Sequence, residues 1–110
     1  MTLQEFQSFI DEQDALFKTI KTTDQNEKER IFSRTIKVAE EFGELCSEVL
    51  ASVGDQRKDK LNIHTTQTIR DEFADVLITT FLLAKSMDID IMESLDHKIQ
   101  KIRTKHNAQL

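Results

Sequence analysis

Turn-forming residues are so scarce in this sequence that they limit the folds it can adopt. The chain has no proline and only two glycines, Gly43 and Gly54, among its 110 residues. Sheet-rich folds need glycine, proline and similar residues at the many corners between strands. The sequence therefore predicts an all-α protein, and its length predicts a single domain over residues 1–110.

The composition limits the setting and the partners of the protein. Charged residues make up 32% of the chain and apolar residues 38%, and the formal net charge is −5. Such a short chain buries little apolar surface by itself, so we expect a homodimer or a homotetramer built as a dimer of dimers. The negative charge argues against a duplex nucleic-acid partner. No apolar run approaches the ~20 residues of a membrane span, and no basic-then-apolar signal opens the chain, so we expect a cytoplasmic protein.

Apolar residues recur at helical spacing in four segments of the chain. The expected helices run from about Thr2 to Lys21, from a break at residues 23–27 to about Val53, from Thr65 or Thr66 to about Met87, and onward from a cap at Asp88 or Asp90. Asp24 and Glu27 have the spacing of a capping box at the start of the second helix. The polar residues 55–63 predict a surface loop after that helix. Together the segments predict a four-helix bundle.

Gly43 falls in the middle of the second expected helix. Glycine at such a position costs about 1 kcal/mol relative to alanine. That cost predicts the close approach of another backbone or of a ligand, unless the glycine is simply tolerated there.

The third expected helix carries the most informative pattern. Its apolar residues cover almost the whole circumference, which predicts a central, buried helix. It nevertheless contains Glu72 and Asp75, one turn apart. A buried carboxylate is very costly unless it is paired or coordinates a metal. The second helix offers a matching pair, Glu41 and Glu44, and packing of the two helices would bring four carboxylates together. All-oxygen ligands suit Mg²⁺, with Mn²⁺ as a substitute, and such a cation binds substrate phosphates and activates water.

Two alternatives to a metal site stay open at this point. The glutamates of the second helix, which are Glu40, Glu41, Glu44 and Glu48, are also typical of a solvated acidic face. Glu72 and Asp75 could instead form ion pairs with Arg70, Lys37 or basic residues of the last helix. The occurrence of two such acidic pairs on consecutive long helices favours the metal site.

Two short runs resemble the signature of the MazG family of nucleoside triphosphate pyrophosphohydrolases. AEEFGEL at residues 39–45 and EFADVLI at residues 72–78 have the ExxE and ExxD pattern of that family. The resemblance implies hydrolysis of a nucleoside triphosphate, by weak preference a deoxynucleotide, to the monophosphate and pyrophosphate in a house-cleaning role. It implies that Mg²⁺ is bound by Glu41, Glu44, Glu72 and Asp75. In this family Glu40 would orient or deprotonate the attacking water.

The resemblance also predicts a phosphate-binding set on the last helix. The family carries a basic cluster there, often with a Lys-Asn pair, and Lys98, Lys101, Arg103 and Lys105 match it in kind. We expect Lys98, Lys101 and Arg103 to bind phosphate, although Ile102 stands where asparagine is usual. The alternative is a solvated basic face at a helix C-terminus, where the helix dipole favours cations.

Base recognition has few candidates in this sequence. The chain lacks Trp and Tyr, so any stacking must use phenylalanine. Gln13 lies in the middle of the apolar stripe of the first helix, close to Phe9. We expect Gln13 and Phe9 to contact the base, the alternative for Gln13 being a satisfied core amide. The rival to an enzyme is a non-enzymatic acidic adaptor or regulatory protein, which has no reason to bury Glu72 and Asp75.

Overall fold

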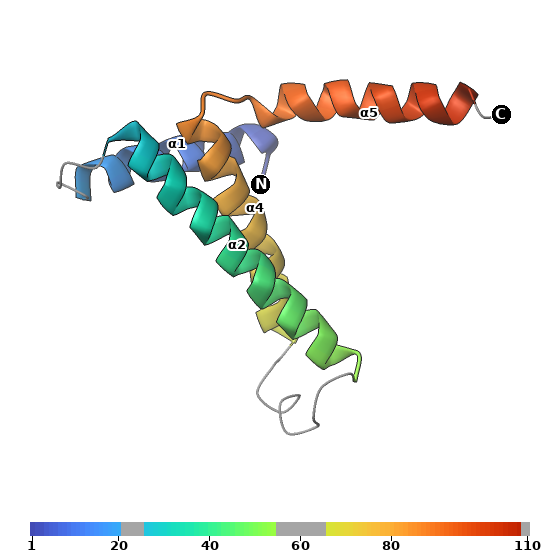
Figure 1. Cartoon of the computed structure of the whole chain (residues 1–110), viewed down its shortest axis with the longest axis horizontal. Coiled ribbons are helices and arrows are strands. Elements are labelled where there is room, and N and C mark those ends of the chain that lie inside the picture. The colour runs from blue at the N-terminus through green and yellow to red at the C-terminus, as the bar shows by residue number, and fades with distance from the viewer. Residues whose placement is uncertain (21–25, 55–65, 109–110) are drawn as a thin grey trace.

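The computed structural model describes residues 1–20, 26–54 and 66–108. These residues form four helices, which are α1 (Leu3–Ile20), α2 (Glu27–Ser52), α4 (Thr66–Ser86) and α5 (Ile91–Ala108) (Figure 1). The described ranges contain no strand. The all-α fold is therefore confirmed, and the helices end close to the predicted positions. The predicted loop at residues 55–63 lies outside the described residues.

The start of α2 differs from the expected capping box. Asn26 is the N-cap, and its side chain accepts a hydrogen bond of 2.8 Å from the backbone N–H of Glu29. Glu27 is the first helical residue, and Asp24 lies outside the described part of the chain. The predicted Asp24–Glu27 capping box is therefore wrong. The reason is that Asn26 accepts a hydrogen bond as an N-cap as well as aspartate does, and it lies immediately before the helix.

Three other helix ends have side-chain or backbone caps. At the start of α1, the backbone N–H of Thr2 donates to the side chain of Glu5, and the backbone N–H of Glu5 donates to the side chain of Thr2, both at 3.1 Å. At α5, Asp90 accepts hydrogen bonds from the backbone N–H groups of residues 92 and 93, so Asp90 is the cap. At the end of α2, Gly54 has a φ of 88°, a left-handed conformation that glycine adopts without steric cost.

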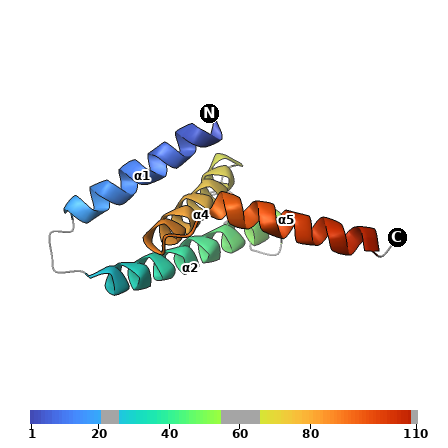
Figure 2. The same ribbon diagram turned by 90° about the horizontal axis from the view of Figure 1, so that it is seen from above.

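The helices α1, α2 and α4 pack together, and α4 lies between the other two (Figure 2). α2 and α4 run in opposite directions along much of their length (Figure 1). α1 packs against the C-terminal half of α4, where the rings of Phe6 and Phe81 meet edge to face with centroids 4.8 Å apart. Ile10, Leu82 and Ala84 are buried in the same region.

A buried ion pair joins the three packed helices. Asp14 of α1 is 5% exposed and Arg34 of α2 is 8% exposed. Arg34 Nη1 donates to Asp14 Oδ1 at 2.7 Å and to the backbone carbonyl of Leu82 at 3.0 Å. Because one guanidinium contacts both neighbours, it fixes how α1 and α4 sit on α2.

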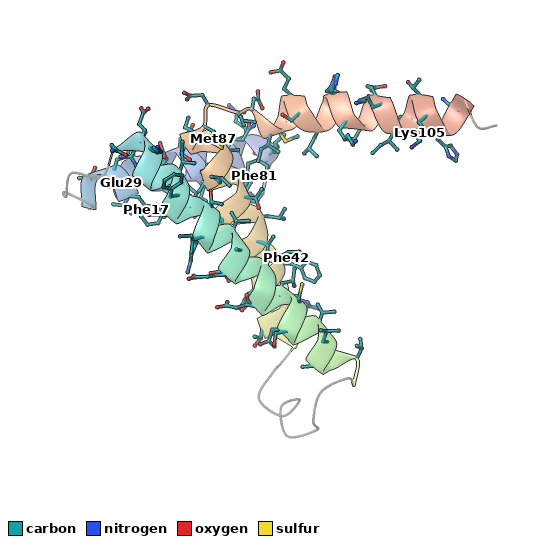
Figure 3. The ribbon with its side chains drawn as sticks, viewed as in Figure 1. Phe17, Glu29, Phe42, Phe81, Met87 and Lys105 are labelled. Carbon is teal, nitrogen blue, oxygen red and sulfur yellow. The ribbon has the colours of Figure 1, made fainter. Side chains whose placement is uncertain are left out.

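The helix α5 extends away from this packed unit and makes no extensive contact with α1, α2 or α4 (Figure 1). Figure 3 shows its side chains radiating outward as far as Lys105. Leu95, Ile99 and Ile102 are all exposed along it. Its apolar residues are therefore not covered by the described residues of the same chain.

The central position expected for α4 is confirmed only in part. Phe73 and Leu77, near its middle, are 53% and 58% exposed. On α2, large apolar residues are exposed as well, and these are Phe32, Ile36, Phe42, Leu50 and Val53. The expectation that α4 is buried all round is wrong for one chain, because α1 covers only its C-terminal half. No described helix is both long enough and apolar enough to cross a membrane.

Gly43 has no close neighbour in the described structure. A Cβ built at this position meets no atom within 4 Å. The expected close approach is therefore not made within one chain. Gly43 instead lies on the exposed side of α2, near Phe42.

Candidate metal centre

Three carboxylates converge where α2 and α4 lie side by side. Glu41 of α2 and Glu72 and Asp75 of α4 each offer an oxygen, and these oxygens lie within 4.8 Å of one another. Oxygens on opposite sides of one Mg²⁺ are about 4.2 Å apart, because each Mg–O bond is about 2.1 Å long. Small side-chain rotations would therefore bring all three onto one cation.

Two oxygens of this cluster lack the hydrogen bonds that a buried oxygen needs. Glu41 is 8% exposed and Glu72 is half-buried. Oε2 of Glu41 and Oε2 of Glu72 are shielded from solvent and have no hydrogen-bond partner among the described residues. An unsatisfied buried polar group costs about 1–3 kcal/mol, and more when it is charged. A hard divalent cation would satisfy both oxygens, so the donor set fits Mg²⁺ or Mn²⁺.

The electrostatics of the cluster favour uptake of positive charge. Burial raises the pKa of Glu72, and the negative charges of Glu44, Asp75 and Glu41 raise it further. Burial also raises the pKa of Asp75, assisted by Glu41 and Asp71 and opposed by Lys37. Both carboxyls therefore bind a proton more readily than usual when no cation is near.

Glu44 lies beside the three converging residues and is exposed. After burial, the charge of Glu44 is the largest cause of the raised pKa of Glu72, so the two carboxyls lie near each other. The structure thus brings all four expected metal ligands, Glu41, Glu44, Glu72 and Asp75, to the same side of the α2–α4 pair.

Lys37 supplies positive charge at the edge of the cluster. Its Nζ lies 3.2 Å from Oε1 of Glu41 and 3.5 Å from Oε2 of Glu40. The hydrogen bond that Lys37 donates to Glu41 raises the pKa of Lys37, and the charges of both glutamates raise it further. The sequence had suggested Lys37 as a partner of Glu72 and Asp75, but its ion pairs are with α2. Glu40 has an exposed side chain and is not among the three converging carboxylates.

The basic residues expected to bind phosphate lie elsewhere in the chain. Lys98, Lys101 and Arg103 are exposed on α5. Because α5 extends away from the α2–α4 pair, one chain does not bring them to the carboxylates (Figure 1).

Of the two residues expected to contact a base, the structure places only Gln13 in a cavity. Gln13 is half-buried and lines a cavity of about 320 Å³ between α1, α2 and α4. Phe9 is exposed and does not line it, whereas Phe17 does. Sequence reasoning missed Arg34, which also lines the cavity. The available signal was Asp14, a charged residue one turn after Ile10 on the buried side of α1 that required a cationic partner.

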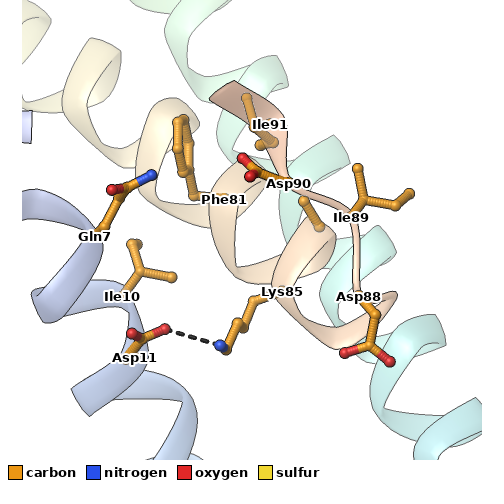
Figure 4. A pocket seen from close by; sticks show the side chains of 10 residues that line it. Gln7, Ile10, Asp11, Phe81, Lys85, Asp88, Ile89, Asp90 and Ile91 are labelled. Carbon is orange, nitrogen blue, oxygen red and sulfur yellow. Dashed lines mark ion pairs between the residues drawn. The ribbon is translucent and has the colours of Figure 1, made fainter. Parts of the chain in front are cut away.

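A second cavity, of about 380 Å³, lies between α1 and the C-terminal end of α4 (Figure 4). An ion pair of 2.9 Å between Asp11 and Lys85 links its two walls. Asp88 and Asp90 of the connection to α5 also line it. None of the expected site residues lies in this cavity.

Comparison with known proteins gives one match. A model of the MazG-like family matches residues 32–109, which include α4, α5 and all four carboxylates. Searches of curated proteins and of solved structures each found no match.

Proposed function

The chain belongs to the MazG-like family, and from that premise we propose that it is a metal-dependent nucleoside triphosphate pyrophosphohydrolase. Membership suggests a pyrophosphohydrolase type of activity. The observation that carries the proposal is the convergence of Glu41, Glu72 and Asp75 within 4.8 Å. The products would be the nucleoside monophosphate and pyrophosphate, and the role would be removal of unwanted nucleotides.

In this proposal Glu41, Glu44, Glu72 and Asp75 hold Mg²⁺, for which Mn²⁺ can substitute. The unpartnered oxygens of Glu41 and Glu72 support the assignment, because a cation would satisfy them. When bound, the cation would neutralise phosphate charge and lower the pKa of a water molecule.

Glu40 is the proposed general base. Its exposed side chain can reach a solvent water, and the ammonium of Lys37, 3.5 Å away, restrains its carboxylate. The water oxygen would bond to the α phosphorus while its proton passes to Glu40. The bond from the α phosphorus to the α–β bridging oxygen would break, and pyrophosphate would leave. A general base must lie within hydrogen-bond reach of the proton that it removes, and it is the resemblance to the family that assigns this role to Glu40.

Lys98, Lys101 and Arg103 are proposed to bind phosphate in an assembly of at least two copies. Within one chain α5 extends away from the carboxylates, so α5 of a second copy would have to supply these cations. The exposed apolar residues of α2, α4 and α5 support assembly, since apolar patches of this extent mark interfaces. Gly43 lies on the exposed side of α2 and leaves room for another helix.

An acidic adaptor is the alternative, and the burial of Glu41 argues against it. An adaptor would present its carboxylates to solvent, where they could meet a basic partner. The deciding experiment is incubation of the protein with a panel of ribo- and deoxynucleoside triphosphates and Mg²⁺, followed by chromatography of the products. Monophosphate and pyrophosphate would support the proposal. Diphosphate and orthophosphate would contradict it while leaving the metal site standing.

A further inference from the structure

The cavity between α1, α2 and α4 borders the carboxylate cluster. Its volume of about 320 Å³ is at the small end of the range for small-molecule sites. Two of its lining residues also contact residues of the carboxylate cluster, and these are Lys37 and Thr79. Lys37 Nζ lies 3.2 Å from Glu41 Oε1, and the Thr79 hydroxyl donates to the backbone carbonyl of Asp75 at 2.8 Å. A ligand could therefore occupy the cavity and extend to the carboxylates.

The cavity is rich in hydrogen-bond donors. Arg30, Arg34 and Lys37 line it together with the amide of Gln13, and no carboxylate is among its described lining residues. Phe17 adds an aromatic ring, and Ile78 and Leu82 add aliphatic surface. This combination suits a flat, partly apolar ligand that carries hydrogen-bond acceptors.

Arg34 offers a donor that the protein itself does not use. Arg34 is 8% exposed, and its Nη1 bonds both Asp14 and the carbonyl of Leu82. Its Nη2 has no hydrogen-bond partner in the described parts of the chain. Buried donors are nearly always paired in folded proteins. An acceptor atom on a ligand in the cavity would complete the hydrogen bonding of this guanidinium.

We propose that this cavity binds the nucleobase and selects bases that present carbonyl oxygens. Arg34 Nη2 and the amide N–H groups of Gln13 donate to those oxygens, and Phe17 contacts the face of the base. The phosphates then extend past Lys37 towards Glu41. Uracil and thymine present two carbonyl oxygens and guanine and cytosine one each, whereas adenine has none. The inference rests on the proposed function for the class of ligand, but binding of a base can be measured without hydrolysis.

The test is titration of the full-length protein with the monophosphates of uridine, thymidine, guanosine and adenosine, followed by NMR. The side-chain amide signal of Gln13 should shift with the first three, and the affinity for adenosine monophosphate should be at least about tenfold weaker, the effect of one lost hydrogen bond. Gln13→Ala and Phe17→Leu should each weaken uridine monophosphate binding by about the same factor. Gln4→Ala, on the exposed side of α1, is the matched control.

Any one of three results would overturn the inference. The first is equal affinity for adenosine and uridine monophosphates, and the second is an unchanged NMR signal of the Gln13 amide. The third is unchanged affinity for uridine monophosphate in both Gln13→Ala and Phe17→Leu. Arg34→Lys keeps the charge but tests the Nη2 donor, and circular dichroism reports whether this variant folds. If Arg34→Lys unfolds, the Gln13 and Phe17 variants still decide. Base-selective binding without hydrolysis would contradict the proposed function alone. Hydrolysis with no preference among bases would contradict the inference alone.

Discussion

The ammonium of Lys37 lies 3.2 Å from Oε1 of Glu41, while Oε2 of the same carboxylate is buried with no hydrogen-bond partner among the described residues. One oxygen of Glu41 is thus paired with a cation from its own helix, and the carboxylate also offers an oxygen within 4.8 Å of oxygens of Glu72 and Asp75 across the α2–α4 contact. The lysine offsets only part of the negative charge of this cluster. The cluster should therefore respond measurably to cations, to pH and to substitution.

We expect Mg²⁺ or Mn²⁺ to raise the melting temperature, and Asp75→Asn to remove most of this effect. A cation that binds only the folded state adds about 2.7 kcal/mol at a hundredfold excess over Kd. Asp75→Asn should also raise the metal-free melting temperature, because it removes one of several neighbouring negative charges. Differential scanning fluorimetry with Mg²⁺ and with a chelator measures both effects, and Asp96→Asn on α5 is the control. If chelation leaves the wild type unchanged from pH 6 to 8, the carboxylates do not form a metal site.

The stability of the metal-free protein should fall as the pH rises from about 4. The pKa values of Glu72 and Asp75 are raised in the folded state from ordinary values of 4.5 and 3.8. The folded state therefore binds more protons than the unfolded state above these ordinary values, and stability is lost as the pH rises through the raised pKa values. Asp14 has a lowered pKa, so its contribution is lost only as the pH falls below 3.8. Urea denaturation with chelator should show the decline in the wild type and a flatter profile in Glu72→Gln. Equal profiles would contradict the prediction.

Replacing any one metal ligand should reduce turnover by about 100-fold or more, since bound metal contributes several kcal/mol to transition-state stabilisation. The variants are Glu41→Gln, Glu44→Gln, Glu72→Gln and Asp75→Asn. Glu48→Gln, one turn beyond Glu44, should lose far less activity. The measurement is the steady-state turnover of each variant and of the wild type with the triphosphate that the wild type hydrolyses fastest. Similar losses in all five variants would point to a general electrostatic role of the acidic face.

Arg34→Met should destabilise the fold by about 3–5 kcal/mol, because among the described residues it leaves the buried Asp14 with only the ion pair to Lys18. Lys85→Ala is the matched control. It breaks the ion pair with Asp11, whose side chain is 62% exposed, and should cost less than about 1 kcal/mol. Urea titration measures both free energies of unfolding. A small loss for Arg34→Met would mean that the buried pair does not hold α1 against α2.

Light scattering at micromolar concentration should give the mass of a dimer or tetramer. The exposed rings and aliphatic side chains of α2 and α4 are the expected contact surface. A charge placed among them, as in Phe73→Asp, should shift the protein towards the monomer. Gln4→Asp on α1 should leave the mass unchanged. A monomer mass for the wild type would contradict both the assembly and the phosphate-binding role of α5.

The helices and the two carboxylate pairs could be predicted because both follow from spacing along one helix. Residues three apart share a face, so Glu41 with Glu44 and Glu72 with Asp75 had to project together. Contacts between helices were harder to foresee, because spacing does not reveal which faces meet. Phe9 illustrates the difficulty. It lies eight residues before Phe17, which is about 80° around the helix, and it therefore misses the cavity that Phe17 lines.

The direction of α5 could not be predicted for a related reason. Apolar residues at helical spacing predict that a helix buries one face, but they do not indicate whether its own chain supplies the cover. Leu95 and Ile99 follow this pattern and are exposed nonetheless. Burial of α4 was overestimated on the same ground, since Phe73 and Leu77 have the spacing of core residues.

The length of the short connection between α4 and α5 determines the orientation of α5. It runs from Met87 to Asp90, and Asp88 within it has a φ of 55°. Adding or deleting one residue there would change the direction in which α5 leaves α4 and the rotation of α5 about its own axis. Lys98 and Lys101 would then face a different direction even though no side chain had changed. The connection should therefore tolerate changes of residue type far better than changes of length.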